Sequence, residues 1–524
     1  MSRALRSAAA HVPTPPPARA ARGAAALSAF AAAAALALAG LSAGATVARA
    51  GDAVPDAARV AWTWPGAADG AAQAVTAIAE ALPMAAADGG IDATMFSTSY
   101  IVTAPAGDRD AGAARPVVFF WNGGPGSAAV GLHATFAPRT PGAAPDRSEL
   151  RGSADNPDSP IDIADLVFVD PVGTGYSRVL GEGAGAAYWG VAQDAEAAAR
   201  FVAAWLRRHG READPVVLVG QSYAGIRVPL AAQRLLDAMP GLDLRGLLLV
   251  APSTGGPRAD AADARAQARR DGARCEARLA VYAQTAAFHG IGAQAGREPE
   301  AIAADVEAFL AARERFDAGD HARIAADIGL PVEQVAGADG CVEPLAFQTG
   351  LLAARGDRVG TADTRLHAPL ALTRTRQPPY DDPATSPYTL DYDLDAAWRH
   401  YLRHEIGYRP AGASGDAGED AYVRLSLAAH GAWDWTWPRW AGASTAPVLA
   451  GLLERAPRLR VLVAVGYYDL SVPYLEPVRT FEAAGLPGPR FAIERYPAGH
   501  AVHADGDARA RSSADLRALI GGAR

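Results

Sequence analysis

The chain alternates between short, nearly continuous apolar runs and longer stretches with the apolar spacing of helices. Four runs end on glycine, proline or aspartate turns, at residues 116–126, 165–175, 215–225 and 244–256. Such runs are typical of strands buried on both faces of a parallel sheet. Helical stretches lie between them, as at residues 191–208. The pattern therefore predicts right-handed crossovers and a doubly wound α/β sheet.

The pattern changes on both sides of this region. Residues 93–102 alternate in polarity and predict an early antiparallel strand. Residues 258–320 are helical in pattern, and residues 355–425 are loop-like. Sheet-like runs resume at residues 458–469 and 490–500.

The length of 524 residues exceeds what one simple core supports, since a single core stops growing at about 250–300 residues. We expect a sheet core in two parts, residues 51–256 and 441–524, interrupted by a mainly helical cap at residues 257–440. Residues 1–50 are expected to form a separate export segment.

The N-terminus has the features of a signal peptide. Residues 1–22 carry several arginines and no acid, residues 23–48 are uncharged, and Ala48-Arg49-Ala50 fits an A-x-A cleavage site. We expect cleavage and export to the periplasm or the medium, with no membrane contact afterwards. The alternative is an uncleaved membrane anchor, because the uncharged run is long enough to span a bilayer.

The net charge and the cysteine content indicate which partners and metals the chain can bind. The net charge of −8 and the lack of a basic block argue against a nucleic-acid partner. The two cysteines, Cys275 and Cys341, form either one disulfide or two free buried thiols. Two isolated cysteines without paired histidines make a poor zinc site, and we expect neither metal nor cofactor.

The stretch "GQSYAG" offers a candidate nucleophile. Ser222 follows an apolar run, with Gly220 two residues before it. A nucleophile elbow needs a strand, a sharp turn and a helix, with small residues around the serine. Ala224 stands where a second glycine is usual, although Gly225 follows it. An ordinary turn serine is the alternative.

A serine hydroxyl needs a base, and the base needs an orienting acid. In this sheet topology the partners follow in the order Ser, Asp, His at later strand ends. Asp469 and His500 each close an apolar run after Ser222. His503 is a rival base, and Asp170, which precedes the serine, is interpreted as structural.

An oxyanion hole needs two backbone N–H groups. Tyr223, directly after the serine, is one expected donor. The glycines of "NGGPG" at residues 122–126 allow close backbone approach, and Gly124 is the expected second donor. The alternative for this stretch is a Gly-Pro turn without function.

The ordered set "FFWNGGPGSAA", "ADLVFVDPVGTGYS", "GQSYAG", "VAVGYYD" and "YPAGH" resembles the serine carboxypeptidase family, most closely its bacterial branch. The resemblance covers about residues 93–256 and 440–505. It implies an α/β-hydrolase fold and removal of C-terminal residues from peptides with a free C-terminus. By this resemblance the triad is Ser222, Asp469 and His500, the oxyanion donors are Gly124 and Tyr223, and the substrate carboxylate lies at Asn122, Gly123 and Gln221.

The chain departs from the family pattern around the carboxylate site. Gln221 replaces the usual glutamate, no acid occurs near Thr135–Phe136, and Phe120 stands where many members have tryptophan. A glutamate must share a proton with a carboxylate, whereas a glutamine amide donates at any pH. We hypothesise that Gln221 still binds the substrate carboxylate. The alternatives are an esterase, amidase or acyltransferase with the same triad, and a non-catalytic secreted binding protein.

Four tryptophans lie together in "WDWTWPRW" at residues 433–440. We expect them to fill the seam between cap and sheet. The alternative is an apolar substrate pocket.

Overall fold

The structure is a computed structural model that describes most of the chain from residue 57 onward. The described residues are 57–66, 70–85, 90–103, 115–140, 153–181, 183–255, 264–313, 315–370, 382–384, 394–410, 422–438, 444–504 and 506–522. The predicted signal segment, residues 1–50, lies outside them, and so do the predicted cap boundaries at residues 257 and 440. Within this described part, no helix combines the length and apolarity needed to cross a membrane.

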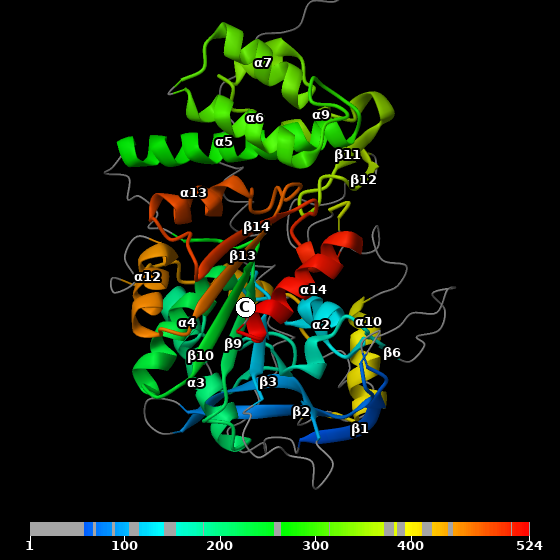
Figure 1. Cartoon of the computed structure of the whole chain (residues 1–524), viewed down its shortest axis with the longest axis vertical. Helices are drawn as coiled ribbons and strands as arrows, with labels where there is room; N and C mark the ends of the chain where they lie inside the picture. The colour runs from blue at the N-terminus through cyan, green and yellow to red at the C-terminus, as the bar shows by residue number, and fades with distance from the viewer. Residues whose placement is uncertain are drawn as a thin grey trace, which may run out of the picture. The chain divides into compact units, whose positions relative to one another are not determined.

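The apolar runs of the sequence form strands of one 10-stranded sheet, shown in Figure 1. The strand order is β1-β2-β3-β7-β4-β9-β10-β13-β14, and β8 pairs with β3. The strands are β1 (Ala58–Trp64), β2 (Gln73–Ala85), β3 (Ile91–Val102), β4 (Val117–Trp121), β7 (Asp165–Val169), β8 (Arg178–Val179), β9 (Val216–Gln221), β10 (Leu244–Val250), β13 (Arg460–Gly466) and β14 (Phe491–Tyr496). Strands β7, β4, β9, β10, β13 and β14 pair in parallel. Strands β1, β2 and β3 extend the sheet antiparallel beyond β7.

The central strands are apolar because both of their faces are covered. Every residue of β4, β7 and β9 is buried. In β4, Phe119 and Trp121 belong to one core, while Val118 and Phe120 belong to the core on the opposite face. Full burial of such a side chain stabilises the fold by about 1.5–3 kcal/mol. The predicted fold class, a mostly parallel doubly wound sheet of the α/β-hydrolase type, is confirmed.

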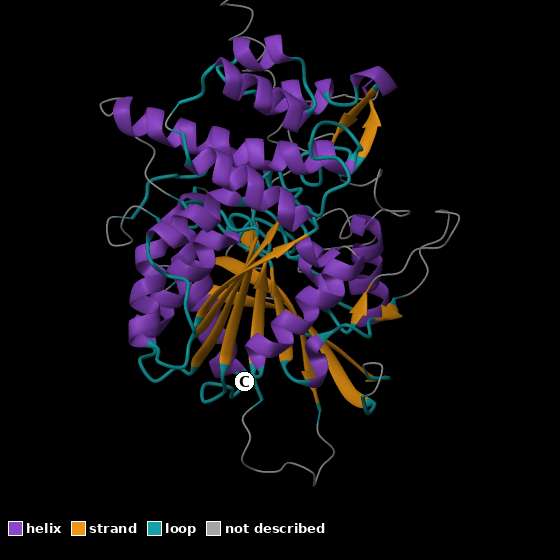
Figure 2. Cartoon of the chain, turned by 45° about the horizontal axis from the view of Figure 1, so that its top comes forward, coloured by secondary structure: helices purple, strands orange, loops and turns teal. Residues whose placement is uncertain are grey.

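Helices cover both faces of the sheet, as Figure 2 shows. Apolar side chains of α3 (Val191–Arg208), α4 (Ala224–Ala238), α12 (Thr445–Arg455) and α13 (Leu475–Ala483) belong to the first core. Side chains of α2 (Val130–Phe136) and α14 (Gly506–Ile520) belong to the second core. The helix predicted at residues 191–208 has the bounds of α3.

Strands β1 and β2, at the antiparallel end of the central sheet, were not predicted from the sequence. Strand β1 is an edge strand whose residues are mostly half-buried or exposed, and β2 is rich in alanine. Neither carries the run of large apolar residues by which the other strands were found. Strand β3 confirms the antiparallel strand expected at residues 93–102.

The segment between β10 and β13 is mainly helical, as predicted, and its described residues add no strand to the central sheet. It contains α5 (Ala264–Phe288), α6 (Pro299–Ala311), α7 (Ala318–Ile328), α8 (Val332–Gly337), α9 (Pro344–Gly350), η3 (Ala353–Arg355), β11 (Asp357–Val359), β12 (His367–Pro369), α10 (Leu394–His400), the π-helical η5 (Tyr401–Ile406) and α11 (Leu427–Gly431). The expectation of loops throughout residues 355–425 was therefore wrong for β11, β12, α10 and η5. Trp398 and Tyr401 are buried in the second core, and this tertiary packing supports elements too short to show a sequence period.

The remaining described elements are short. They are β5 (Arg139–Thr140), β6 (Ala154–Asp155), η1 (Pro160–Asp162), η2 (Ala184–Ala187) and η8 (Val502–Ala504). Strands β5 and β6 form a separate two-stranded sheet.

A disulfide lies within the helical segment. Cys275 of α5 is bonded to Cys341, which follows α8, and their Cα atoms are 5.3 Å apart. The structure thus has one disulfide rather than two free thiols at these positions, and it links α5 to the turn after α8.

Candidate active site

The strand order creates a switch point at the carboxyl edge of the sheet. Strand β4 lies between β7 on one side and β9 on the other. Loops that leave two such neighbouring strands diverge, and in open α/β sheets the crevice between them is where ligands bind. The loop after β4 is the glycine-rich stretch at residues 122–126, and the turn after β9 carries Ser222.

The turn at Ser222 has the geometry of a nucleophile elbow. Ser222 has a φ of 61°, in the left-handed region that non-glycine residues rarely occupy, and α4 begins two residues later. A Cβ on Gly220 would lie 2.5 Å from the carbonyl oxygen of Ala224, and one on Gly225 would lie 2.4 Å from Pro252. These close approaches explain why positions 220 and 225 are glycine, since a larger residue would clash there. Ala224 is fully buried at the position where a second glycine is usual.

Asp469 and His500 form a hydrogen-bonded pair. Nδ1 of His500 lies 2.7 Å from Oδ2 of Asp469. The other oxygen of this buried carboxylate accepts the backbone N–H groups of Ser471, at 2.8 Å, and Val472, at 3.0 Å. The carboxylate is therefore fixed, and it selects the tautomer in which Nε2 of His500 is the basic nitrogen.

The charge of Asp469 also changes the pKa of His500. Burial alone lowers the pKa of His500, but the charge of Asp469 and its hydrogen bond outweigh burial and raise this pKa above its ordinary value. An imidazolium formed during a reaction would be stabilised by the same carboxylate.

The residue before Ser222 contacts the backbone of His500. The side-chain amide of Gln221, the residue before Ser222, donates to the carbonyl oxygen of His500 at 3.0 Å. This contact brings the backbone of His500 next to the elbow. Among the described residues, no hydrogen bond joins Oγ of Ser222 to the imidazole, and such bonds are often long before substrate binds.

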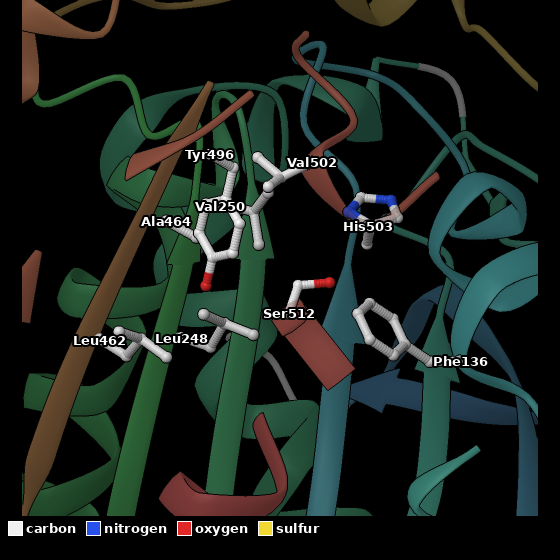
Figure 3. Close-up of a pocket in the computed structure, with 9 residues that line it drawn as sticks. All are labelled: Phe136, Leu248, Val250, Leu462, Ala464, Tyr496, Val502, His503 and Ser512. Atoms are coloured by element: carbon white, nitrogen blue, oxygen red, sulfur yellow. The ribbon is translucent and has the colours of Figure 1, made fainter. Parts of the chain in front are cut away.

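His503, the rival base, has different surroundings. Its ring is buried, packs 5.3 Å from the ring of Phe136 between centroids, and makes no hydrogen bond to Asp469. Burial, together with the charges of His500 and Arg509, lowers its pKa to about 3. Figure 3 shows His503 at the wall of a small, mostly apolar cavity formed with side chains of β10, β13 and α14. The contact with Asp469 thus belongs to His500.

Asp170 has a structural contact. Its Oδ1 accepts the backbone N–H of Ala129, the residue before α2, at 2.8 Å. Burial raises its pKa to about 7, against the lowering effect of its backbone hydrogen bonds. The side chain thus supports the start of α2, and in the described part of the chain it makes no hydrogen bond to Ser222 or His500.

The two expected oxyanion donors come from adjacent loops. A Cβ on Gly123 would lie 2.5 Å from the backbone nitrogen of Tyr223 and 2.8 Å from Cβ of Ser222, so the loop after β4 packs directly on the elbow. Gly124 has a φ of 103°, which favours glycine. Within the described ranges, the backbone N–H groups of Gly124 and Tyr223 donate no hydrogen bond to the protein.

The two amides expected to hold a carboxylate contact each other. Nδ2 of Asn122 donates to Oε1 of Gln221 at 2.7 Å, and Oδ1 of Asn122 accepts the N–H of Leu132 at 3.1 Å. Because Gln221 also donates to His500, each of the two amide nitrogens keeps one hydrogen that bonds to no other described residue. The sequence indicated these residues but not the bond that Gln221 makes to His500.

Residues 101–267 match the family model for serine carboxypeptidases. Over this segment, the match confirms the family resemblance of the sequence motifs. The match supports a serine-type carboxypeptidase of the hydrolase class. The matched segment contains the loop after β4, the elbow and all of β9 and β10.

The chain is also similar to solved structures at low sequence identity. They include Kex1, a prohormone-processing carboxypeptidase from Saccharomyces cerevisiae (12% identity, 86% of this chain and 90% of that chain, TM-score 0.49). Others are an acetylester hydrolase from Corynebacterium glutamicum (13%, 84% and 96%, TM-score 0.36) and lipase A from Candida antarctica (12%, 91% and 84%, TM-score 0.31). No curated protein sequence matches the chain.

Sequence reasoning missed Arg227 in this carboxypeptidase. This buried side chain of α4 donates from Nη1 to the carbonyl oxygen of Asn122, and from Nε to Asp194, both at 2.7 Å. Its guanidinium lies 5.4 Å from the ring centroid of Tyr223. Arg227 thus fixes the loop after β4 relative to the elbow. The helix that follows "GQSYAG" contains two arginines, Arg227 and Arg234, and its local pattern does not show which of them contacts the loop.

Of the tryptophans in residues 433–440, some are packed in the interior and one is partly exposed. Trp433 is buried and packs edge-on against Tyr223, with centroids 5.2 Å apart, and Trp437 covers Gly255. Trp435 also contacts Tyr223 edge-on at 5.8 Å, but it is 43% exposed. Trp440 lies outside the described residues. Packing therefore explains Trp433 and Trp437.

Proposed function

We propose that the chain is an exported carboxypeptidase that removes C-terminal residues from peptides through an acyl-enzyme on Ser222. The observation that carries the proposal is the 2.7 Å bond between His500 and Asp469, with the backbone of His500 held by Gln221 next to the elbow. Base, orienting acid and nucleophile thus come from the ends of three parallel strands, β14, β13 and β9.

In the proposed reaction, Oγ of Ser222 attacks the carbonyl carbon of the last peptide bond while Nε2 of His500 takes the hydroxyl proton. The N–H groups of Gly124 and Tyr223 stabilise the negative oxygen of the tetrahedral intermediate. The intermediate collapses when His500 gives its proton to the leaving amine. A water molecule, deprotonated by His500, then cleaves the acyl ester and frees Ser222.

The free carboxylate of the substrate is assigned to Asn122, Gly123 and Gln221. The remaining amide hydrogens of Asn122 and Gln221 support this assignment, because neither side chain needs to be protonated to donate. The close packing of Gly123 on Tyr223 keeps this loop next to the reacting bond.

Export is proposed from the sequence of residues 1–50, which combine a basic start, an uncharged run and an A-x-A site. The disulfide between Cys275 and Cys341 supports it, since disulfides persist in oxidising compartments. N-terminal sequencing of the protein recovered outside the cytoplasm tests this part, with Gly51 as the expected first residue.

The reaction is tested with N-blocked dipeptides that carry either a free C-terminus or a C-terminal amide. We expect hydrolysis of the free acid to dominate, and Ser222→Ala to abolish both hydrolysis and fluorophosphonate labelling while the protein stays folded. Labelling that persists in Ser222→Ala would show that Ser222 is not the nucleophile. Equal rates on acid and amide would indicate an esterase, amidase or acyltransferase instead.

A further inference from the structure

The backbone of His500 is held from two sides. Its carbonyl oxygen accepts the amide of Gln221 from β9. Its N–H donates at 2.6 Å to the carbonyl oxygen of Ala362, which lies in the helical segment rather than in the sheet core. Ala362 belongs to the turn between β11 and β12, residues 360–366, called here the β11–β12 loop.

The same loop also holds the residues on either side of Asp469. The N–H of Thr364 donates to the carbonyl oxygen of Tyr468 at 3.0 Å, and the N–H of Leu470 donates to the carbonyl oxygen of Thr361 at 3.0 Å. Asp469 is thus fixed between two backbone bonds to one loop. That loop therefore contacts the neighbouring backbone of both members of the His500–Asp469 pair.

Close packing accompanies these bonds. A Cβ on Gly499 would lie 2.5 Å from the carbonyl oxygen of Ala362 and 2.6 Å from Cβ of Asp363. Arg365 donates to the carbonyl oxygen of Pro497 at 2.8 Å, and its guanidinium lies 5.1 Å from the ring centroid of Tyr468. The β11–β12 loop and the loop that carries His500 therefore have little room to move independently.

The β11–β12 loop is in turn attached to α5 through Thr364, which is fully buried. Oγ1 of Thr364 lies 2.5 Å from Oγ1 of Thr285 and donates to the carbonyl oxygen of Tyr468 at 3.2 Å. The carbonyl oxygen of Thr364 accepts from Nε2 of His289 at 3.0 Å. Thr364 therefore connects Thr285 of α5, and His289 directly after α5, to the residue before Asp469. In Figure 1, α5 crosses the helical segment near α13 and the ends of β13 and β14.

We propose that the β11–β12 loop is a positioning element of the active site, and that the hydroxyl of Thr364 transmits the position of α5 to the Asp469–His500 pair. The helical segment is then part of the rigid frame that sets the reacting geometry, in addition to any contact with substrate. This inference rests on the proposed roles of Asp469 and His500.

The test compares Thr364→Val, which keeps the shape but removes the hydroxyl, with Thr364→Ser, which restores a hydroxyl. Thr349→Val is the matched control, because Thr349 lies in the same segment and its hydroxyl bonds, among the residues that the structure describes, to Leu345 one helical turn away. Because a small misplacement of reacting groups is costly, we expect Thr364→Val to lower kcat on the order of tenfold. We expect KM to stay within about twofold, since the loop acts on the reacting pair rather than on binding.

Thr364→Ser and Thr349→Val are expected to keep the wild-type kcat. The proposal is overturned if folded Thr364→Val has the wild-type kcat, or if Thr349→Val loses as much activity as Thr364→Val. If Thr364→Val does not fold, Arg365→Gln decides, because Arg365 is partly exposed. Its loss removes the bond to Pro497, the contact with Tyr468 and the ion pair with Asp363 of the same loop. A fall in kcat at constant KM supports the proposal, and an unchanged kcat overturns it.

Fluorophosphonate labelling separates this proposal from the proposed function. If the wild type is labelled at Ser222 and Thr364→Val is labelled at the same rate, the role of the β11–β12 loop is wrong while the triad stands. If the wild type is not labelled, the proposed triad itself is wrong.

Discussion

The side-chain amide of Gln221 donates a hydrogen bond to the carbonyl oxygen of His500, 3.0 Å away, while its oxygen accepts from Asn122. One side chain thus joins the expected carboxylate site to the backbone of the expected base. A glutamate at this position could donate to His500 only when protonated. The replacement of glutamate by glutamine therefore removes one pH requirement from the geometry of the site.

Gln221→Glu tests this relationship. At pH 7 an ionised carboxylate would face the carbonyl oxygen of His500, and the lost bond should lower kcat/KM on the order of tenfold. The ratio of variant to wild-type activity should recover as the pH falls and the glutamate is protonated. The measurement is kcat/KM for a blocked dipeptide across pH. Superimposable pH profiles for the two proteins would contradict this account.

Asp469→Asn tests the base and its pKa. Activity needs neutral His500, and Asp469 raises the pKa of His500, so wild-type kcat/KM should rise with pH around a midpoint above the ordinary value of about 6.5. In Asp469→Asn the pKa of His500 falls, and the midpoint should move to lower pH. Loss of the correct tautomer should also lower kcat on the order of 10⁴-fold.

The ionisable groups around His500 show which group the measured pH midpoint reports. In the described part of the chain, the charge of Asp469 acts on His500, and His503 next to it has a pKa of about 3, which leaves His503 neutral over the range measured. A midpoint that does not move in Asp469→Asn would show that the observed titration belongs to another group.

The choice between the two histidines is tested by paired variants. His500→Gln should lower kcat by at least on the order of 10³-fold, because it removes the base. His503→Leu should keep kcat within about threefold, because the ring lies in an apolar environment and contacts neither Asp469 nor Ser222. Both are measured by kcat and by fluorophosphonate labelling. The reverse ranking would make His503 the base.

Gly123→Ala tests the packing of the loop on the elbow. The new Cβ would lie 2.5 Å from the nitrogen of Tyr223, so the loop must shift, and kcat should fall on the order of 10²-fold. Gly451→Ala is the control, since a Cβ there meets no atom within 4 Å and Gly451 lies inside α12. It should raise stability by roughly 0.5–1 kcal/mol with unchanged kcat. Wild-type activity in Gly123→Ala would refute the close contact.

Removal of the disulfide tests its contribution to stability. Cys275 and Cys341 are 66 residues apart, and loss of such a link typically lowers the free energy of unfolding by about 2–4 kcal/mol. Chemical denaturation of the wild type and of the double variant Cys275→Ala/Cys341→Ala measures this difference in the free energy of unfolding. Coincident unfolding curves would show that the bond contributes nothing.

Much of the fold follows from local sequence. The runs that became β4, β7, β9 and β10 are apolar because both faces of a central strand are covered, and α3 has the expected bounds. The strand ends placed Ser222, Asp469 and His500 at one edge, because the carboxyl ends of parallel strands meet there. These features depend on each segment's own pattern, so the sequence alone indicated them.

Other features depend on contacts between distant segments. The alanine-rich β2 is a strand because β1 and β3 pair with it, and His500 rather than His503 contacts Asp469 because of how their loop packs. The bond from Gln221 to His500, the position of Arg227 beneath Asn122 and the β11–β12 loop had no local signal. Periodicity records which face of an element is buried, whereas only the packed chain determines which side chain fills a given contact.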